Sequence, residues 1–451
     1  MQIDRYSSTI REFLWANEDW RKVGARTKVG VVMPSLRQAT PSLEGVSMPL
    51  SPYRTGMGIR PIVLAGRDDL IARAGRVLDG LGTERSSGGM TIFVGPPGVG
   101  KTVLLKEIEK VAQQRNLTVC WLACDEVSDN IHLLASRTAE SIQSLSTPAG
   151  FSEIFKDRLR SLNVEFTMYG IKLASQPSKT DERVDRRQAL REVLADAATH
   201  VTKHSRSGML VLVDEYHNLP SDQRVIFETA VHDIFHANAT TPLAFFGAGL
   251  TSSSDRAANS YGDRFEFEPV HRLDVSEAEV ALTGPATTLG VAWDDDARKF
   301  ALSATAGWPY LIQQVGDETW HQANPEPGET MRMEHVRPAI QQVWTRLAYG
   351  VFQSRWRSAS SDEQRFMLAM ASGADSTGAT ATTEIFRLAG NAGWQIRSAL
   401  QDRGIIERAS RGVLRFTVPG FAEYILQQGE EDILSLMLPT TESTNTPALE
   451  S

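Results

Sequence analysis

Short apolar runs alternate with longer segments of helical periodicity through the first half of this 451-residue chain. The runs at 91–94, 117–124, 209–213 and 243–251 are apolar at most positions, which is typical of buried strands. Helical periodicity follows the first run, and residues 127–203 are also mostly helical in pattern. Within them, residues 164–173 could be an inserted strand or a hairpin, and residues 176–187 are expected to be a polar surface loop. Strands that alternate with helices predict an α/β fold built on a parallel sheet.

The second half of the chain changes to a helical pattern. Helices are predicted over 276–288, 294–306, 309–323 and 333–350, and Ser276-Glu277-Ala278-Glu279 matches a capping box before the first. From residue 358, helices are predicted after the capping box Ser360-Ser361-Asp362-Glu363, over 383–389 and over 392–403. A hairpin over 405–418 turns at Arg411-Gly412, and a last helix covers 421–428. Three helices followed by a hairpin predict a winged helix-turn-helix.

Composition narrows the function classes only a little. Hydrophobic residues make up 41% of the chain and charged residues 23%, as in ordinary soluble proteins, and no apolar run approaches the roughly 20 residues that span a bilayer. The first residues lack the apolar segment of a signal peptide, so a cytoplasmic location is expected. Cys120 and Cys124 lie on one face of a predicted strand and are expected to be core thiols. The net charge of −8 argues against general coating of nucleic acid but allows a local basic surface.

The stretch from residue 90 to 110 carries the strongest chemical signal. A predicted strand enters the pattern G-x-x-x-x-G-K-T at Gly95, Gly100, Lys101 and Thr102, and a helix follows at once. Strand, glycine-rich loop and helix together are the P-loop, in which glycines let backbone N–H groups approach phosphates. Lys101 would reach the β- and γ-phosphates of ATP and Thr102 would ligate Mg²⁺. The nucleotide-binding residues are therefore expected to be Gly95, Pro96, Pro97, Gly98, Val99, Gly100, Lys101, Thr102 and Val103.

A second signal follows the apolar run at 209–213, which ends in Asp214 and Glu215. Ligands of open α/β sheets collect at the carboxyl ends of the strands. This pattern is typical of a Walker B motif, in which Asp214 would hold the Mg²⁺ shell and Glu215 would polarise the attacking water. The histidines of His232-Asp233-Ile234-Phe235-His236 have zinc-protease spacing, but aspartate replaces the glutamate base, so a zinc site is not expected.

Apolar residues at 61–65 lead into Gly66-Arg67-Asp68 shortly before the P-loop. This arrangement resembles the hhGRE motif of origin-recognition-like AAA+ ATPases and of the related STAND ATPases. The resemblance covers about residues 61–428 and implies an AAA+ parallel sheet, a helical lid and a C-terminal winged helix. It places Arg67 near the adenine, with a surface arginine in a turn as the alternative.

The same resemblance suggests further site residues. Thr251 or Ser252 stands where a polar sensor 1 residue is often found. Arg264, with Arg256 in reserve, would act in trans on a neighbour's γ-phosphate, the alternative being a structural salt bridge. Gly307-Trp308-Pro309 resembles the GxP motif whose proline packs near the nucleotide, although Pro309 also suits the first position of a helix. No sensor 2 arginine stands near this point, so hydrolysis is expected to be slow and to depend on self-association.

In the winged helix, the predicted helix over 392–403 would read the major groove of DNA. Trp394, Ile396 and Leu400 are expected to face the core. The expected DNA contacts are Gln395, Arg397 and Ser398 in the groove, and Arg408, Arg411 and Arg415 on phosphates. Residues 387–415 hold six arginines against two acids, a modest basic excess. The alternative is a winged helix that packs on the ATPase or docks a protein.

The predicted organisation is an extended arm over 1–60, an AAA+ domain over 61–273, a helical lid over 274–357, a winged helix over 358–428 and an acidic, partly disordered tail over 429–451. The first hypothesis for function is an ATPase that uses ATP and Mg²⁺ as a switch controlling double-stranded DNA binding. The rival is a STAND-type, nucleotide-gated protein-interaction switch. Self-association or a protein partner is expected under either hypothesis, and a membrane is not.

Overall fold

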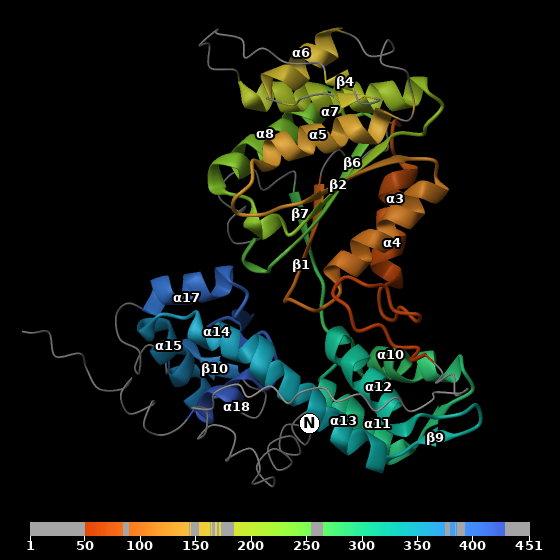
Figure 1. The fold of residues 1–451 in the computed structure, drawn as a ribbon. Coiled ribbons are helices and arrows are strands. Elements are labelled where there is room, and N and C mark those ends of the chain that lie inside the picture. Colours follow the sequence, from red (N-terminus) through yellow and green to blue (C-terminus); the bar gives the residue numbers. More distant parts are fainter. Residues whose placement is uncertain are drawn as a thin grey trace, which may run out of the picture. The chain divides into compact units, whose positions relative to one another are not determined.

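The computed structural model describes residues 50–83, 90–143, 145, 153–162, 164, 167–168, 171–172, 185–253, 265–374, 379–383, 385 and 393–428 (Figure 1). The chain divides into two compact units. One consists of Ser51–Ala292 with Gly307–Asp317, and the other includes Trp293–Ala306 and the described residues from Glu318 onward. Within the described ranges, no helix has the length and apolar character that crossing a bilayer requires.

A parallel sheet forms the centre of the first unit. Its strands are β1 (Met90–Val94), β2 (Thr118–Ala123), β5 (Met209–Asp214), β6 (Leu243–Gly249) and β7 (Phe265–Pro269), in the order β2-β5-β6-β1-β7. The four strands predicted from apolar runs are confirmed. Because all five run parallel, their carboxyl ends lie along one edge of the sheet.

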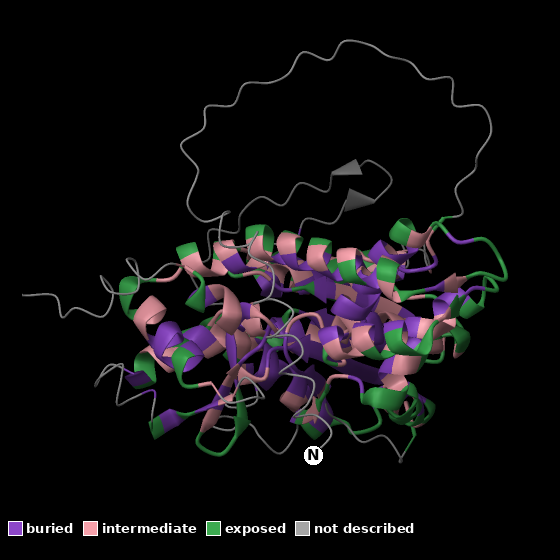
Figure 2. Ribbon diagram, turned by 90° about the horizontal axis from the view of Figure 1, so that it is seen from below, coloured by how far each residue is buried: buried purple, intermediate pink, exposed green. Residues whose placement is uncertain are grey.

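Helices cover both faces of this sheet (Figure 1). On one face, α4 (Lys101–Gln114) packs on alternate residues of β5 such as Leu210 and Leu212, and α3 (Asp68–Asp79) packs on α4. The other face is covered by α5 (Asn130–Gln143), α7 (Arg186–Lys203) and α8 (Ser221–Ala237), which share a core with Met209, Val211 and Val213. Figure 2 shows this burial, with purple in the interior and mixed pink and green on the outer helices. Both faces of β5 are therefore apolar, as expected for a doubly covered strand.

A small insertion precedes α7. It contains α6 (Glu153–Ser161) and the antiparallel strands β3 (Thr167–Met168) and β4 (Ile171–Lys172), so the predicted hairpin is present. Residues 173–184, most of the expected polar loop, lie outside the described residues. The helix predicted next has its expected apolar face, because Leu190, Val193, Leu194, Ala197 and Val201 are all buried.

The predicted lid helices occur with their ends shifted by at most a few residues. They are α10 (Val275–Thr287), α11 (Asp295–Thr305), α12 (Pro309–Ala323) and α13 (Met333–Leu347), and α13 continues through η3 (Ala348–Phe352) into α14 (Gln353–Arg357). The short strands β8 (Ala292–Trp293) and β9 (Thr330–Met331) lie between them. The capping box predicted at Ser276 is wrong. Asp274 caps α10 instead. Its carboxylate accepts from the Glu277 N–H at 2.8 Å, and the Glu277 carboxylate accepts from the Asp274 N–H at 2.8 Å.

The C-terminal part combines α15 (Ser361–Ser372), α17 (Gly393–Asp402) and α18 (Phe421–Leu426) with the antiparallel strands β10 (Ala379–Ala381), β11 (Ile406–Ser410) and β12 (Val413–Phe416). Ser360 and Glu363 form the predicted capping box of α15. The hairpin turns at Gly412, which has a φ of 77°. Strand β10 was not predicted, and residues 386–392, most of the expected second helix, lie outside the described part of the chain.

One side chain of α17 contradicts the predicted core. Trp394 is 70% exposed, whereas Leu400 is buried and Ile396 is partly buried. Residues six apart on a helix lie about 120° apart around its axis, so Trp394 cannot share a face with Leu400. The pair at i and i+4, Ile396 and Leu400, does share one.

Candidate nucleotide-binding site

The P-loop connects the end of β1 to the start of α4. The Gly95 N–H donates to Gly249 O on β6 at 3.3 Å, which fixes the first residue of the loop to the sheet. Gly98 and Gly100 have φ values of 79° and 97°, a left-handed conformation that favours glycine. Gly100 is the N-cap of α4, so the first N–H groups of that helix face the loop. This backbone suits an anion.

Lys101 lies across the loop rather than away from it. Its Nζ donates to Gly95 O at 2.8 Å and to Pro96 O at 3.0 Å. Thr102 follows in the first turn of α4 and is partly buried. An ammonium, a hydroxyl and helix N-terminal amides therefore meet at one end of α4, as the sequence predicts for a phosphate site.

The acidic pair follows β5 on the same edge of the sheet. Asp214 is buried, and one of its carboxylate oxygens accepts from the Glu215 N–H at 2.9 Å. Glu215 has a φ of 53°, a left-handed backbone that is uncommon for a non-glycine residue. Its carboxylate lies 3.5 Å from His217 Nδ1. Strained backbone of this kind is concentrated at functional sites.

Electrostatics connect the two motifs. Burial raises the pKa of Glu215 above its ordinary value, the negative charge of Asp214 adds to this, and the charge of Lys101 opposes it. Strands β1 and β5 run parallel in one sheet with β6 between them, so the P-loop after β1 and the acidic pair after β5 lie at the same edge. A carboxyl with a raised pKa is suited to accept a proton from water.

A buried pair behind Glu215 was missed by the sequence reasoning. The Tyr216 hydroxyl, in the short helix η2 (Tyr216–Asn218), donates to the Glu228 carboxylate on α8. Burial raises the pKa of Glu228 above its ordinary value, although the Tyr216 hydroxyl and Arg224 act in the opposite direction. The pair anchors the turn that carries Glu215 to α8.

Arg67 is buried beside the P-loop, so the alternative of a surface arginine is wrong. Its guanidinium donates to Val99 O at 3.1 Å and to His271 O at 2.8 Å, and also to Gly66 O. Burial lowers the pKa of Arg67, an effect that the charge of Glu277 opposes. Arg67 therefore connects α3, the P-loop and the segment after β7, and its predicted contact with adenine stays a prediction.

The segment Gly307-Trp308-Pro309 also lies against the P-loop, within the same unit. Gly307 has a φ of 70°, and its carbonyl accepts from the Leu273 N–H at 2.9 Å. Pro309 is the first residue of α12, and the Tyr310 N–H that follows donates to Gly98 O at 3.3 Å. The start of α12 is thereby joined to the loop that the sequence assigns to phosphate.

The remaining residues that the sequence predicts for the site are those of sensor 1 and the arginine finger. Thr251 and Ser252 follow β6, and the Ser252 hydroxyl is buried with no hydrogen-bond partner among the described residues. Arg256 and Arg264 lie outside the described residues, so their suggested action in trans stays a prediction.

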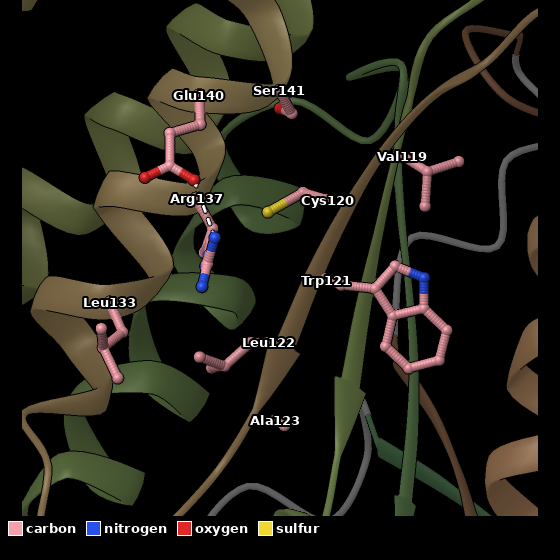
Figure 3. A pocket seen from close by; sticks show the side chains of 9 residues that line it. All are labelled: Val119, Cys120, Trp121, Leu122, Ala123, Leu133, Arg137, Glu140 and Ser141. Atoms are coloured by element: carbon pink, nitrogen blue, oxygen red, sulfur yellow. Dashed lines mark hydrogen bonds and ion pairs between the residues drawn. The ribbon is translucent and has the colours of Figure 1, made fainter. Parts of the chain in front are cut away.

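A cavity of about 540 Å³ along β2 is lined by residues of β2 and α5 alone (Figure 3). Because neither the P-loop nor Asp214 contributes to its lining, this cavity is separate from the candidate site.

The residues predicted to contact DNA are distributed over α17 and the β11–β12 hairpin. Gln395, Arg408 and Arg411 are exposed, whereas Ser398 and Arg397 are partly buried, and Arg397 Nε donates to Gln401 Oε1 at 3.1 Å. Arg415 differs from the prediction of an available cation, because its Nε donates to Glu407 at 2.6 Å. The two are direct cross-strand partners in the hairpin. Of the three arginines predicted to contact phosphates, Arg408 and Arg411 are therefore the exposed ones.

The comparisons agree with the geometry of the first unit. Residues 63–244 match the family described as AAA ATPase domain. The matched residues include both the P-loop and the acidic pair after β5. Residues 349–425 match a family described only as a domain of unknown function (DUF8462), and no curated protein matches the sequence.

Solved structures resemble this chain in fold. The Walker-type ATPase of Pyrococcus abyssi aligns with 84% of this chain and 99% of its own, with a TM-score of 0.53 and 14% identity. Cdc6p from Pyrobaculum aerophilum aligns over 84% and 96%, with a TM-score of 0.40 and 14% identity. Drosophila ORC bound to DNA aligns over 88% and 96%, with a TM-score of 0.39 and 15% identity. At 14% identity the first likeness shows a shared fold and no more.

Proposed function

We propose that this protein is an ATP-controlled switch whose AAA ATPase domain binds ATP with Mg²⁺ and whose C-terminal part binds double-stranded DNA. The observation that carries the first half is the arrangement around Lys101. A left-handed glycine at the N-cap of α4, an ammonium lying in the loop and the buried Asp214 are three independent requirements of a nucleotide–Mg²⁺ site.

The residues present fit the nucleotide and the metal. The amides of the P-loop and Lys101 would hold phosphate oxygens, and Thr102 and Asp214 would hold Mg²⁺, directly or through water. The bound metal would neutralise charge on the phosphates. Lys101 would exchange its contacts to Gly95 O and Pro96 O for phosphate oxygens, which are better partners for an ammonium than carbonyls are.

Glu215 is proposed to orient and deprotonate the attacking water. Its raised pKa and its strained backbone, held by the Tyr216–Glu228 pair, support this role. Hydrolysis is proposed to be slow. Arg264 would accelerate it in a self-associated form, since an arginine finger is worth roughly 10³–10⁵ in rate where it acts.

Two variants test the nucleotide half of the proposal. Lys101→Ala should remove binding of ATP–Mg²⁺ measured by isothermal titration calorimetry, whereas Glu215→Gln should bind as wild type does. Glu215→Gln should hydrolyse far less, because only the polarisation of water is lost. Wild-type affinity in Lys101→Ala would contradict the site, and wild-type turnover in Glu215→Gln would contradict the role of the carboxylate.

The C-terminal part is proposed to be a winged helix-turn-helix. The support is the sequence of α15, α17 and the β11–β12 hairpin, with β10 completing a three-stranded sheet. In such a domain α17 would enter the major groove, and the hairpin would lie on the phosphate backbone. Gln395 is exposed on α17 and suits a contact in the groove. Arg408 and Arg411 are exposed on the hairpin and suit contacts with phosphates.

Two observations favour the protein-docking alternative. Trp394 is largely exposed on α17, and tryptophan is enriched among the residues that dominate protein–protein interfaces. Arg403 and Arg415 are engaged by Glu363 and Glu407, which reduces the positive charge offered to phosphates. Under this alternative, Trp394 rather than Arg411 would carry the binding energy.

Fluorescence anisotropy of a labelled duplex at low salt separates the two readings. Arg411→Ala should weaken binding on all duplexes and lower the slope of log K against log salt by about one unit. Arg397→Ala should instead alter preference between sequences, if a preferred site exists. Arg365→Ala is the matched control, because Arg365 is already paired with Asp362 on α15. Failure of the wild-type protein to bind any duplex, with and without ATP, would replace the DNA reading by the docking one.

A further inference from the structure

Trp308 has a polar atom that the fold leaves without a partner. The side chain is only 2% exposed, and Nε1 has no hydrogen-bond partner among the described residues. A buried donor left unpaired costs about 1–3 kcal/mol. Tryptophan N–H groups that are buried usually find an acceptor. The position of Nε1 therefore needs an explanation.

The unpaired N–H lies at the P-loop. Nε1 is 2.6 Å from the place that a β-carbon on Gly98 would occupy, so the indole sits directly over the loop at its left-handed glycine. Two hydrogen bonds hold the flanking backbone. The Leu273 N–H donates to Gly307 O at 2.9 Å, and the Tyr310 N–H donates to Gly98 O at 3.3 Å. The backbone on both sides of Trp308 is thus held against the segments that form the site.

A cation increases the strength of this donor. The guanidinium carbon of Arg272 lies 4.8 Å from the centroid of the Trp308 ring. A cation over an aromatic face draws electron density toward itself and makes the indole N–H more acidic. The group beside the P-loop is therefore a polarised, desolvated donor that suits an anionic acceptor.

We propose that Trp308 Nε1–H donates a hydrogen bond to a phosphate oxygen of the bound nucleotide. The inference rests on the proposed nucleotide binding and adds to it a ligand contact from the start of α12. Through this contact, α12 would respond to occupancy of the P-loop. Nucleotide binding would give this buried donor an acceptor.

Trp308→Phe tests the contact by affinity, because phenylalanine keeps an aromatic ring in the site and lacks the N–H. Loss of a hydrogen bond to a charged acceptor should weaken binding of ATP–Mg²⁺ to Trp308→Phe by about ten- to a hundredfold, measured by calorimetry. Trp121→Phe is the matched control and should bind as wild type does, since Trp121 lies on β2 and lines the cavity to which the P-loop contributes no residue. Circular dichroism checks that both variants are folded.

A spectroscopic readout separates a hydrogen bond from a packing effect. In wild-type protein labelled with ¹⁵N-indole tryptophan, the resonance that disappears in Trp308→Phe belongs to Trp308. Saturating ATP–Mg²⁺ should move this indole proton downfield and slow its exchange with solvent, as expected for a new bond to phosphate.

The possible results separate the role of Trp308 from the proposed binding of ATP–Mg²⁺. If wild-type protein shows no ATP binding by calorimetry, the proposed nucleotide binding fails and the inference falls with it. If wild-type protein binds ATP while the Trp308 resonance stays in place and Trp308→Phe binds equally tightly, nucleotide binding stands and the role of Trp308 is overturned.

Discussion

Replacing Arg67 by methionine should destabilise the nucleotide-binding unit without removing any residue of the P-loop. Methionine has a similar length and can fill the buried site, so the main change is the loss of the guanidinium. Two long-range hydrogen bonds disappear, those to Val99 O at 3.1 Å and to His271 O at 2.8 Å. Both carbonyls would then lose this donor at a site shielded from water, since Arg67 is only 6% exposed.

The size of the effect follows from these two bonds. Each hydrogen bond from a charged donor contributes about 1.5–3 kcal/mol, which sets the upper range at about 3–6 kcal/mol. Removing the guanidinium also removes its own desolvation penalty, the main reason its pKa is lowered. The expected loss in the free energy of unfolding is therefore about 3–4 kcal/mol. For a unit of about 250 residues this corresponds to a fall in Tm of about 10 °C.

The assay is differential scanning calorimetry of the full chain, followed on the transition that ATP–Mg²⁺ raises in the wild-type protein. Arg73→Met is the matched control on α3, because Arg73 pairs with Glu268 at 2.8 Å but is half exposed. An exposed pair contributes only about 0.2–1 kcal/mol, so this variant should unfold within a few degrees of wild type. Equal transitions for Arg67→Met and Arg73→Met would refute the claim that Arg67 holds the P-loop.

Two further predictions concern buried groups. Burial raises the pKa of Glu228, so its contribution to stability is present below its ordinary pKa and is lost as pH rises through the higher folded-state pKa. Glu228→Gln should therefore gain Tm over wild type as the pH is raised from about 5 to about 8, and a constant difference would contradict this. Burial also raises the pKa values of Cys120 and Cys124 to about 12. A thiol reagent near neutral pH should react with them only after denaturation, and rapid labelling of the folded protein would count against their core position.

Local patterns predicted much of the site because its parts are contiguous in the chain. The apolar strand before Gly95, the glycines with left-handed backbone and the helix that starts at Lys101 are all encoded within a short stretch. The strand of the predicted Walker B motif could also be recognised from sequence, since both faces of β5 are buried and every position up to Val213 is apolar. The structure adds that both motifs meet at one edge of the sheet.

The features that sequence reasoning missed depend on tertiary contacts or on exact phase. Arg415 looked available until the register of the hairpin placed it opposite Glu407. Trp394 was assigned to the core by its apolar character, against the helical phase that exposes it. The acceptors of Arg67 and the partner of Tyr216 come from segments far along the chain or on another element. The two overlapping capping patterns at Asp274 and Ser276 could be separated only by backbone geometry.

The coupling between nucleotide and DNA is the central claim of this account, and one titration tests it most directly. The affinity of the Glu215→Gln variant for a labelled duplex would be measured by anisotropy with and without saturating ATP–Mg²⁺, beside Lys101→Ala under both conditions. We expect the two affinities of Glu215→Gln to differ by about fivefold or more, as is typical of coupled sites, and those of Lys101→Ala to be equal. Equal affinities for Glu215→Gln in the presence and absence of ATP would contradict an ATP-controlled DNA-binding switch.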